Sequence, residues 1–139
     1  MSGLSLPRSL AEALLAHARA EEPNEACGLL SGSLSNGHAG AYHPARNGEA
    51  SPLRYTVHPD DLLRIMLAID DGGEDLLAIF HSHTRSPAVP SATDLREARY
   101  PDPFYLLASL AEASAPPEVA LRAWRIVDGR SSEVPLTIG

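Results

Sequence analysis

Two histidines separated by one serine are the residues with the clearest chemical potential. His81 and His83 follow the apolar run "DLLAIF". On a β-strand, side chains two residues apart point to the same side, about 6.5–7 Å apart along the chain. Both imidazoles would therefore converge while Ser82 points away. Zinc binds imidazole nitrogens at about 2.0–2.1 Å, and a catalytic zinc keeps three protein ligands and one open position. The pair predicts part of a zinc site.

A third ligand is required, and Asp94 is the candidate that the spacing offers. Ser91 is a good N-cap residue, so Asp94 falls in the first turn of a helix that we expect over 91–100. The helix dipole favours an ionised carboxylate at that position. Pro87 and Pro90 restrict the connection and help hold the strand end beside the helix start. With Zn²⁺ bound to two neutral imidazoles and one carboxylate, the site would keep a net positive charge. This charge lowers the pKa of a bound water toward about 7.

A His-x-His pair alone is more often a chance or surface feature than a metal site, but the longer arrangement is specific. His81-x-His83, seven residues, Ser91, two residues and Asp94 together resemble the signature of the JAMM (MPN-plus) metallopeptidases. Glu25, in "NEACGLLSG", matches the upstream glutamate of that family. The resemblance covers most of the chain. It implies a cytidine-deaminase-like α+β fold, with a mixed β-sheet flanked by helices.

The resemblance also implies a role for each of these residues. His81, His83 and Asp94 would be the ligands of one Zn²⁺ per chain. Glu25 would be the general base that takes a proton from water and returns it to the leaving amine. Ser91 would donate a hydrogen bond to the oxyanion of the tetrahedral intermediate. Amide hydrolysis needs an activated nucleophile, a stabilised oxyanion and a protonated leaving group, so the set is chemically complete.

The substrate class follows from the branch of the family that the chain resembles. Thr84 stands where many members have proline, and "HSHT" is similar to the small bacterial branch that releases cysteine. The implied reaction is hydrolysis after the C-terminal Gly-Gly of a ubiquitin-like or sulfur-carrier protein of the ThiS, MoaD or CysO type, releasing cysteine or exposing the mature tail. A glycine tail can lie extended in a narrow groove and pair with a strand edge.

Two other functions compete with this hypothesis. One is a non-catalytic MPN-type scaffold that binds a protein partner; such members typically lack ligands, whereas here every ligand is present. The other is a small-molecule zinc amidohydrolase that uses the same metal chemistry. Metal analysis followed by assays on a protein fusion and on acyl-amino acids separates the three.

The remaining elements must bring Glu25 and the downstream motif to one place. Periodicity and turn residues predict two further helices, over 7–21 and 59–71. Asp128-Gly129 is a hairpin turn signal. No regular βαβ rhythm is present, which favours an α+β fold with a mixed sheet in a single domain, 1–139. The expected strands cover residues 26–32, 37–47, 53–58, 75–80, 104–110, 119–127 and 133–138.

Composition excludes some functions and narrows the setting. The net charge of −7 argues against nucleic-acid binding. We expect no membrane span and no secretory signal, and the single cysteine, Cys27, fits a cytoplasmic protein. Cys27 is more typical of a small buried hydrophobic residue than of a ligand or redox switch. The oligomeric state stays open, a homodimer included. Three arginines flank the proposed site, either to meet a carboxylate or as a solvated helix face: Arg85, Arg96 and Arg99.

Overall fold

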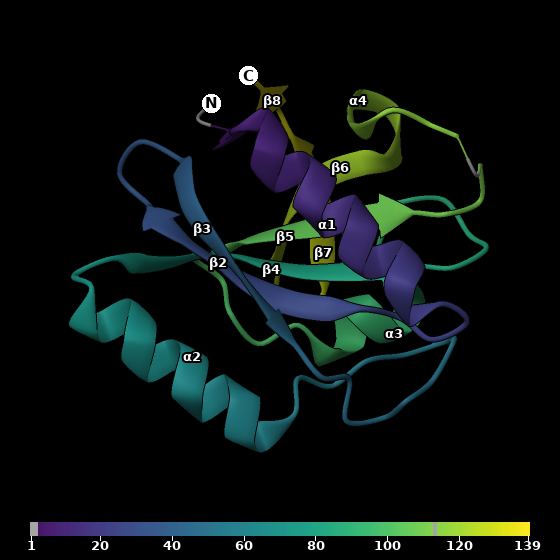
Figure 1. Ribbon diagram of the computed structural model, residues 1–139, viewed down its shortest axis with the longest axis horizontal. Helices are drawn as coiled ribbons and strands as arrows, with labels where there is room; N and C mark the ends of the chain where they lie inside the picture. Colours follow the sequence, from purple (N-terminus) through teal and green to yellow (C-terminus); the bar gives the residue numbers. More distant parts are fainter. Residues whose placement is uncertain (1–2, 113) are drawn as a thin grey trace.

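The chain folds around one mixed, eight-stranded β-sheet (Figure 1). The computed structural model describes residues 3–112 and 114–139. None of the helices in these ranges is long and apolar enough to cross a membrane. The helices are α1 (Arg8–Glu21), α2 (Pro59–Asp71), α3 (Ala92–Glu97) and α4 (Pro117–Ala120), and the strands are β1 (Leu4–Leu6), β2 (Cys27–Ser33), β3 (His38–Ala45), β4 (Asp75–His83), β5 (Phe104–Ser109), β6 (Leu121–Val127), β7 (Arg130–Val134) and β8 (Leu136–Ile138).

The sheet curves strongly, since its two edge strands, β7 and β8, follow each other directly in the sequence and must therefore come close together. The strand order is β7-β6-β5-β4-β2-β3-β1-β8. Only Pro135 separates the strands at the two ends, and its carbonyl accepts a hydrogen bond from the backbone N–H of Leu4 (2.9 Å). The curve encloses α1, which lies across the sheet in Figure 1.

Two apolar clusters hold the helices to opposite faces of the sheet. The buried stripe of α1 packs with inward residues of β2, β4 and β5, among them Leu30, Phe80 and Leu106. On the other face, Ile65 and Ile69 of α2 pack in a cluster with Ile79. This arrangement confirms the predicted α+β fold with a mixed sheet flanked by helices. The apolar spacing of the sequence correctly predicted α1 and α2.

The central position of β4 brings the distant parts of the site together. The strand lies between antiparallel β2 and parallel β5 and is buried from Leu77 to His83, as its unbroken apolar run predicted. Cys27, the first residue of β2, pairs with His81. Glu25 stands two residues before that pairing, so strand register places it beside the carboxyl end of β4.

The predicted strand over 53–58 is wrong. These residues belong to an irregular loop, 46–58, with one isolated bridge between Asn47 and Val57. The side chain of Asn47 forms hydrogen bonds with backbone groups of this segment that would pair with a neighbouring strand if the segment were a β-strand. Its amide donates to the carbonyl of Arg54 (3.1 Å), and its oxygen accepts from the N–H of Thr56 (3.1 Å).

The C-terminal region also differs from the prediction. Proline cannot donate to a ladder, so Pro135 divides the expected strand 133–138 into β7 and β8. The expected strand 119–127 begins only at Leu121, after the short helix α4. Strand β1 was not predicted. The predicted hairpin is confirmed: Asp128 and Gly129 both have positive φ, 53° and 73°, between β6 and β7.

Candidate metal centre

The three predicted ligands converge at the carboxyl end of β4. Asp94 Oδ2 lies 3.1 Å from His81 Nε2 and 3.0 Å from His83 Nε2. One ligand atom from each residue lies within 4.8 Å of the other two. Two atoms each about 2.0–2.1 Å from a tetrahedral ion are about 3.3 Å apart, so this spacing fits a single zinc.

The backbone fixes the orientation of His83. Its Nδ1–H donates to the carbonyl of Pro87 at 2.8 Å, which leaves Nε2 directed at Asp94 Oδ2. Metal-binding histidines almost always use their second ring nitrogen in this way. Pro87 therefore shapes the connecting loop and also provides the acceptor that orients the candidate ligand His83.

A capping box holds Asp94 in position. Ser91 Oγ accepts a hydrogen bond from the N–H of Asp94 (3.0 Å), and Asp94 Oδ2 accepts one from the N–H of Ser91 (2.9 Å). Burial opposes ionisation, but the nearby imidazoles of His81 and His83, together with the hydrogen bond from the N–H of Ser91, hold the pKa of Asp94 well below its usual range. Asp94 is therefore ionised at ordinary pH. Helix α3 itself ends at Glu97, short of the predicted residue 100.

Glu25 is buried beside these ligands, with only 4% of its surface exposed. Its N–H donates to the carbonyl of Ser51 (2.8 Å), and its own carbonyl accepts from Asn47 (3.0 Å). Burial raises the pKa of Glu25 to about 7; His83 lowers it in part and Asp94 raises it further. A carboxyl group with a pKa near 7 can accept and release a proton at neutral pH.

Buried polar atoms without hydrogen-bond partners support a cation site here. Among residues 3–112 and 114–139, the buried side-chain atoms without a hydrogen-bond partner are Glu25 Oε1 and both ring nitrogens of His81. His81 Nε2 is close to Asp94, but not aligned as a hydrogen bond. Burial lowers the pKa of His81, which favours the neutral imidazole that binds metals. Buried polar atoms are costly without partners, and a metal ion would satisfy Nε2.

Sequence reasoning assigned no role to Ser82, which ties two parts of the site together. Its Oγ accepts a hydrogen bond from the N–H of Ala26 (2.8 Å), and its N–H donates to the Ala26 carbonyl (3.0 Å). Ala26 follows Glu25 directly, so this double contact fixes the glutamate against β4. The signal in the sequence was the serine between the histidines, but its partner lies 56 residues away.

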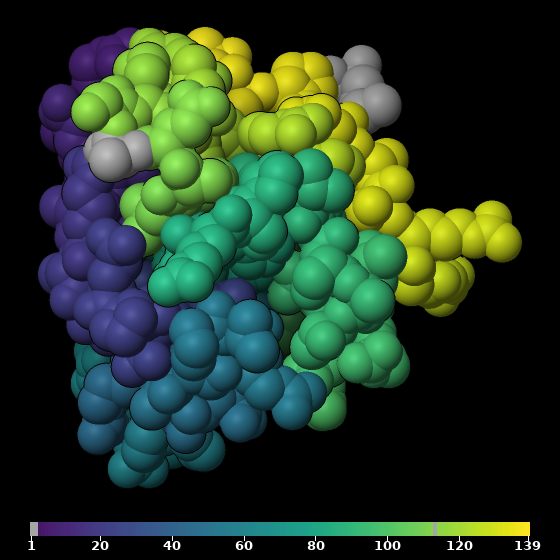
Figure 2. Space-filling model, turned by 90° about the vertical axis from the view of Figure 1, so that its right-hand side faces the viewer, coloured from purple at the N-terminus to yellow at the C-terminus, as the bar shows by residue number. Residues whose placement is uncertain are grey.

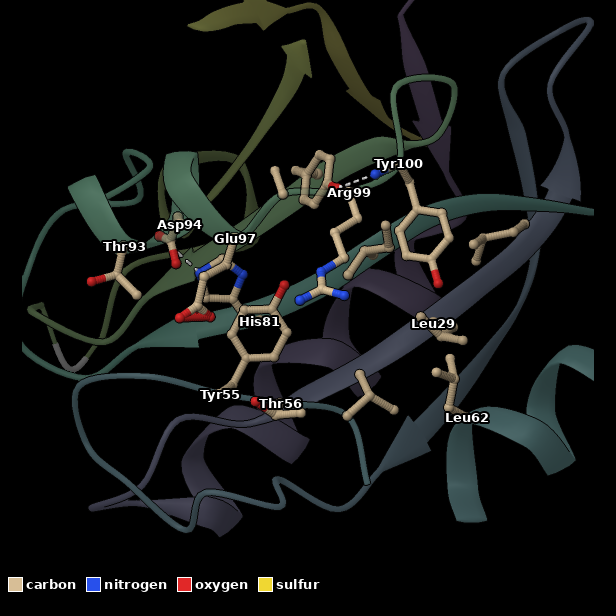
Figure 3. A pocket seen from close by; sticks show the side chains of 15 residues that line it. Leu29, Tyr55, Thr56, Leu62, His81, Thr93, Asp94, Glu97, Arg99 and Tyr100 are labelled. Atoms are coloured by element: carbon tan, nitrogen blue, oxygen red, sulfur yellow. Dashed lines mark hydrogen bonds and ion pairs between the residues drawn. The ribbon is translucent and has the colours of Figure 1, made fainter. Parts of the chain in front are cut away.

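A cavity of about 310 Å³ opens beside the candidate ligands His81 and Asp94 (Figure 3). Its floor is apolar and includes Leu29, Leu62 and Ile79. Of the three flanking arginines, Arg99 lines the cavity and points its guanidinium inward, toward the hydroxyl of Tyr55 in Figure 3. Arg85 and Arg96 are exposed. Sequence reasoning did not find Tyr55, which it placed on a strand.

One wall of the cavity comes from loop 46–58 and the other from α3 and the residues after it. In Figure 2 the blue loop lies beside the green segment that carries α3. Arg54 and Glu97 form an ion pair between the two walls at 2.7 Å. Cys27 lies below the site, fully buried in the α2 cluster, which confirms the prediction of a small buried residue.

Comparison with known sequences identifies the family. Residues 7–127 match the family of prokaryotic homologues of the JAB domain. The chain belongs to this family. The resemblance to JAMM metallopeptidases is thereby confirmed, and the chain is a JAMM-type metallopeptidase.

Individual relatives agree with this assignment. The chain is 37% identical over 135 residues to the CysO-cysteine peptidase of Mycobacterium tuberculosis, covering 97% of this chain and 90% of the relative. It is 37% identical over 113 residues to a desampylase of Haloferax volcanii, covering 78% and 81%.

Solved structures support the fold. A protein from Desulfitobacterium hafniense is 33% identical with a TM-score of 0.87, covering 98% of this chain and 92% of that one. A JAB1/MPN domain protein from Archaeoglobus fulgidus is 18% identical with a TM-score of 0.63, covering 100% and 99%. The second likeness shows that the fold is the MPN fold.

Proposed function

We propose that this JAMM protein is a zinc-dependent peptidase that hydrolyses the bond after the C-terminal Gly-Gly of a ubiquitin-like or sulfur-carrier protein. The observation that carries the proposal is the convergence of His81, His83 and Asp94, with Glu25 buried alongside. A structural scaffold would gain nothing from burying a carboxyl group and an imidazole whose polar atoms have no partner among the described residues.

One Zn²⁺ per chain would be held by His81 Nε2, His83 Nε2 and Asp94 Oδ2. The donor set fits, because two imidazoles and one carboxylate are a known combination for catalytic zinc. When bound, zinc lowers the pKa of a coordinated water and polarises a carbonyl oxygen. The protein contributes the dry setting, since both histidine side chains are at least 96% buried.

Glu25 would accept a proton from the attacking water and deliver it to the leaving amine. Burial keeps its pKa near that of a base working at neutral pH. Its Oε1 is free of hydrogen bonds to the described residues, so it is available for this transfer. Ser82, through Ala26, and Asn47 hold the Glu25 backbone at this position.

Ser91 would stabilise the oxyanion. Its Oγ accepts from the N–H of Asp94, and that contact leaves the hydroxyl proton available to a second acceptor. Ser91 is exposed at the start of α3, where substrate can reach it. The cap and the oxyanion contact are therefore compatible within one side chain.

The substrate class is supported by the relatives. They are named CysO-cysteine peptidase, desampylase and probable TtuB-protein conjugate cleaving protease. Each name refers to a carrier or conjugate rather than to a small molecule. The cavity beside the ligands has an apolar floor and room for a few residues of an extended tail. We expect the carrier tail to bind there, and the protein to act in the cytoplasm.

A fusion of a sulfur-carrier protein with a C-terminal cysteine tests the proposal. Purified protein should contain about one zinc per chain and release cysteine. Glu25→Gln should keep the zinc and lose about 10²–10⁴-fold in turnover, whereas His81→Ala should lose the zinc. Glu22→Gln, at an exposed glutamate, is the matched control. Normal cleavage by Glu25→Gln would refute the mechanism, and cleavage of acyl-amino acids but not of carrier fusions would refute the substrate class.

A further inference from the structure

The two histidines of the metal centre are held in different ways. His83 donates its Nδ1–H to the Pro87 carbonyl (2.8 Å). His81 Nδ1 is buried and has no acceptor within residues 3–112 and 114–139. A metal-binding histidine usually relies on that second hydrogen bond for its ring orientation. Another contact must therefore fix the ring of His81.

The ring of Tyr55 provides that contact. It stacks on His81 with the ring centroids 4.3 Å apart and the planes inclined by 19°. Figure 3 shows the tyrosine ring directly against the imidazole. Within residues 3–112 and 114–139 the ring of His83 has no such stacking partner, and it meets the ring of His81 edge-on, at 5.1 Å and 63°. We propose that Tyr55 is a positioning residue, whose ring orients His81 toward the metal in place of the missing hydrogen bond.

Asn47 fixes the position of Tyr55. Its side chain binds the carbonyl of Arg54 and the N–H of Thr56, the two residues that flank the tyrosine. The same amide donates to the Glu25 carbonyl (3.0 Å). Asn47 therefore couples the backbone around Tyr55 to the strand end that carries the proposed base.

The ring, rather than the hydroxyl, should carry this effect. In Figure 3 the hydroxyl lies next to the guanidinium of Arg99, and the ring of Tyr55 is what stacks on the imidazole. Loss of a group that orients a ligand typically costs about 10–100-fold in metal affinity. Tyr55→Phe should therefore keep the affinity, and Tyr55→Leu should lose about this factor.

Metal binding by the purified protein tests the inference without an activity assay. Zinc affinity is measured by competition with a chelator, and the ligand field by the visible spectrum of Co²⁺ bound in place of zinc. Tyr55→Leu should bind zinc about 10–100-fold more weakly and change the Co²⁺ spectrum. Tyr55→Phe should keep the zinc affinity and the Co²⁺ spectrum of the wild type. Tyr100→Leu, which changes another tyrosine of the same cavity, is the matched control and should bind as wild type.

The inference rests on the proposed metal centre, and the outcomes separate the two. A wild-type protein that binds no zinc contradicts the proposed function. A wild-type protein that binds zinc, with Tyr55→Leu equal to it in affinity and spectrum, contradicts only the role of Tyr55. Loss of affinity in Tyr55→Phe would also overturn it, because the hydroxyl would then be responsible. If Tyr55→Leu fails to fold, Asn47→Ser decides: weaker zinc binding supports the role, and unchanged binding refutes it.

Discussion

The candidate metal centre joins two regions that are built in different ways. We call β2 and β4 the frame, and loop 46–58 together with α3 and its capping residue Ser91 the cover. Frame residues are buried almost throughout and are held by sheet hydrogen bonds. The cover is largely exposed and is held by side-chain contacts. The frame supplies the imidazoles, and the cover supplies the carboxylate, the hydroxyl and the stacking ring. Folding free energy and chemical function should therefore be separable by mutation.

The largest effect on stability should come from the frame. Phe80 is fully buried on β4 and packs edge-on against Tyr42, with ring centroids 5.6 Å apart. Phe80→Ala should reduce the free energy of unfolding by about 3–5 kcal/mol, measured by urea denaturation. Leu53→Ala is the counterpart in the cover, where the side chain is 82% exposed, and should change it by less than about 0.5 kcal/mol. Equal losses in the two variants would refute the comparison.

In the cover, a substitution at Ser91 should affect catalysis much more than stability. Ser91→Ala removes the cap of α3 and the proposed oxyanion donor. We expect a loss of about 1 kcal/mol in unfolding free energy, but a fall in kcat of about 10²–10³-fold. Steady-state cleavage of a carrier–cysteine fusion gives kcat, and urea denaturation gives stability. Ser91→Thr should recover both in part.

A matched serine checks that the Ser91 effect is specific. Ser86 is exposed in the loop before α3, and its contact with Ser109 uses only its backbone carbonyl. Ser86→Ala should therefore leave kcat and stability unchanged. If Ser91→Ala kept a normal kcat, the hydroxyl would be a helix cap and nothing more.

The sequence predicted the frame better than the cover, for a physical reason. His81 and His83 could be placed because the alternation of side chains along a strand is a local property, and the apolar run before them indicates a strand. Asp94 could be placed because a capping serine three residues earlier marks the helix start. Tyr55 could not be placed, because its position depends on Asn47. The Asn47 side chain replaces strand pairing with three hydrogen bonds within the loop and one to the carbonyl of Glu25.

The same reason explains the errors at the chain ends. Strands β7 and β8 are five and three residues long, and their partners come from opposite ends of the sheet. Pro135 marks the break, but the sequence does not say that the chain continues into a parallel pairing with β1. Such pairings depend on how the whole sheet curves around α1.

Glu25 lies where frame and cover meet, and its titration should affect stability without metal. Its pKa is about 7 in the folded protein, above the ordinary value of 4.5. The folded state therefore holds this proton more tightly than the unfolded state, and stability falls as pH rises from about 4.5 to 7. In metal-free protein, Glu25→Gln should be more stable than wild type by about 1–3 kcal/mol at pH 8. The difference should vanish near pH 4.

Urea denaturation of chelator-treated protein across this pH range measures the effect. Glu22→Gln, at an exposed glutamate, is the matched control variant in the same series. A pH-independent difference between Glu25→Gln and wild type would mean that the carboxylate is already ionised without cost in the folded protein.

The smallest expected effect concerns the contact between the two parts of the cover. Arg54 and Glu97 pair at 2.7 Å, with side chains 48% and 42% exposed, so a double-mutant cycle should give a coupling of only about 0.2–1 kcal/mol. Arg122 and Glu133 are a matched pair at the same distance on the sheet edge. Both couplings should shrink in 1 M salt. Only Arg54→Ala should change the KM for the carrier fusion, because Arg54 joins the walls of the cavity. Equal KM values in Arg54→Ala and Arg122→Ala would show that the frame alone sets the shape of the cavity.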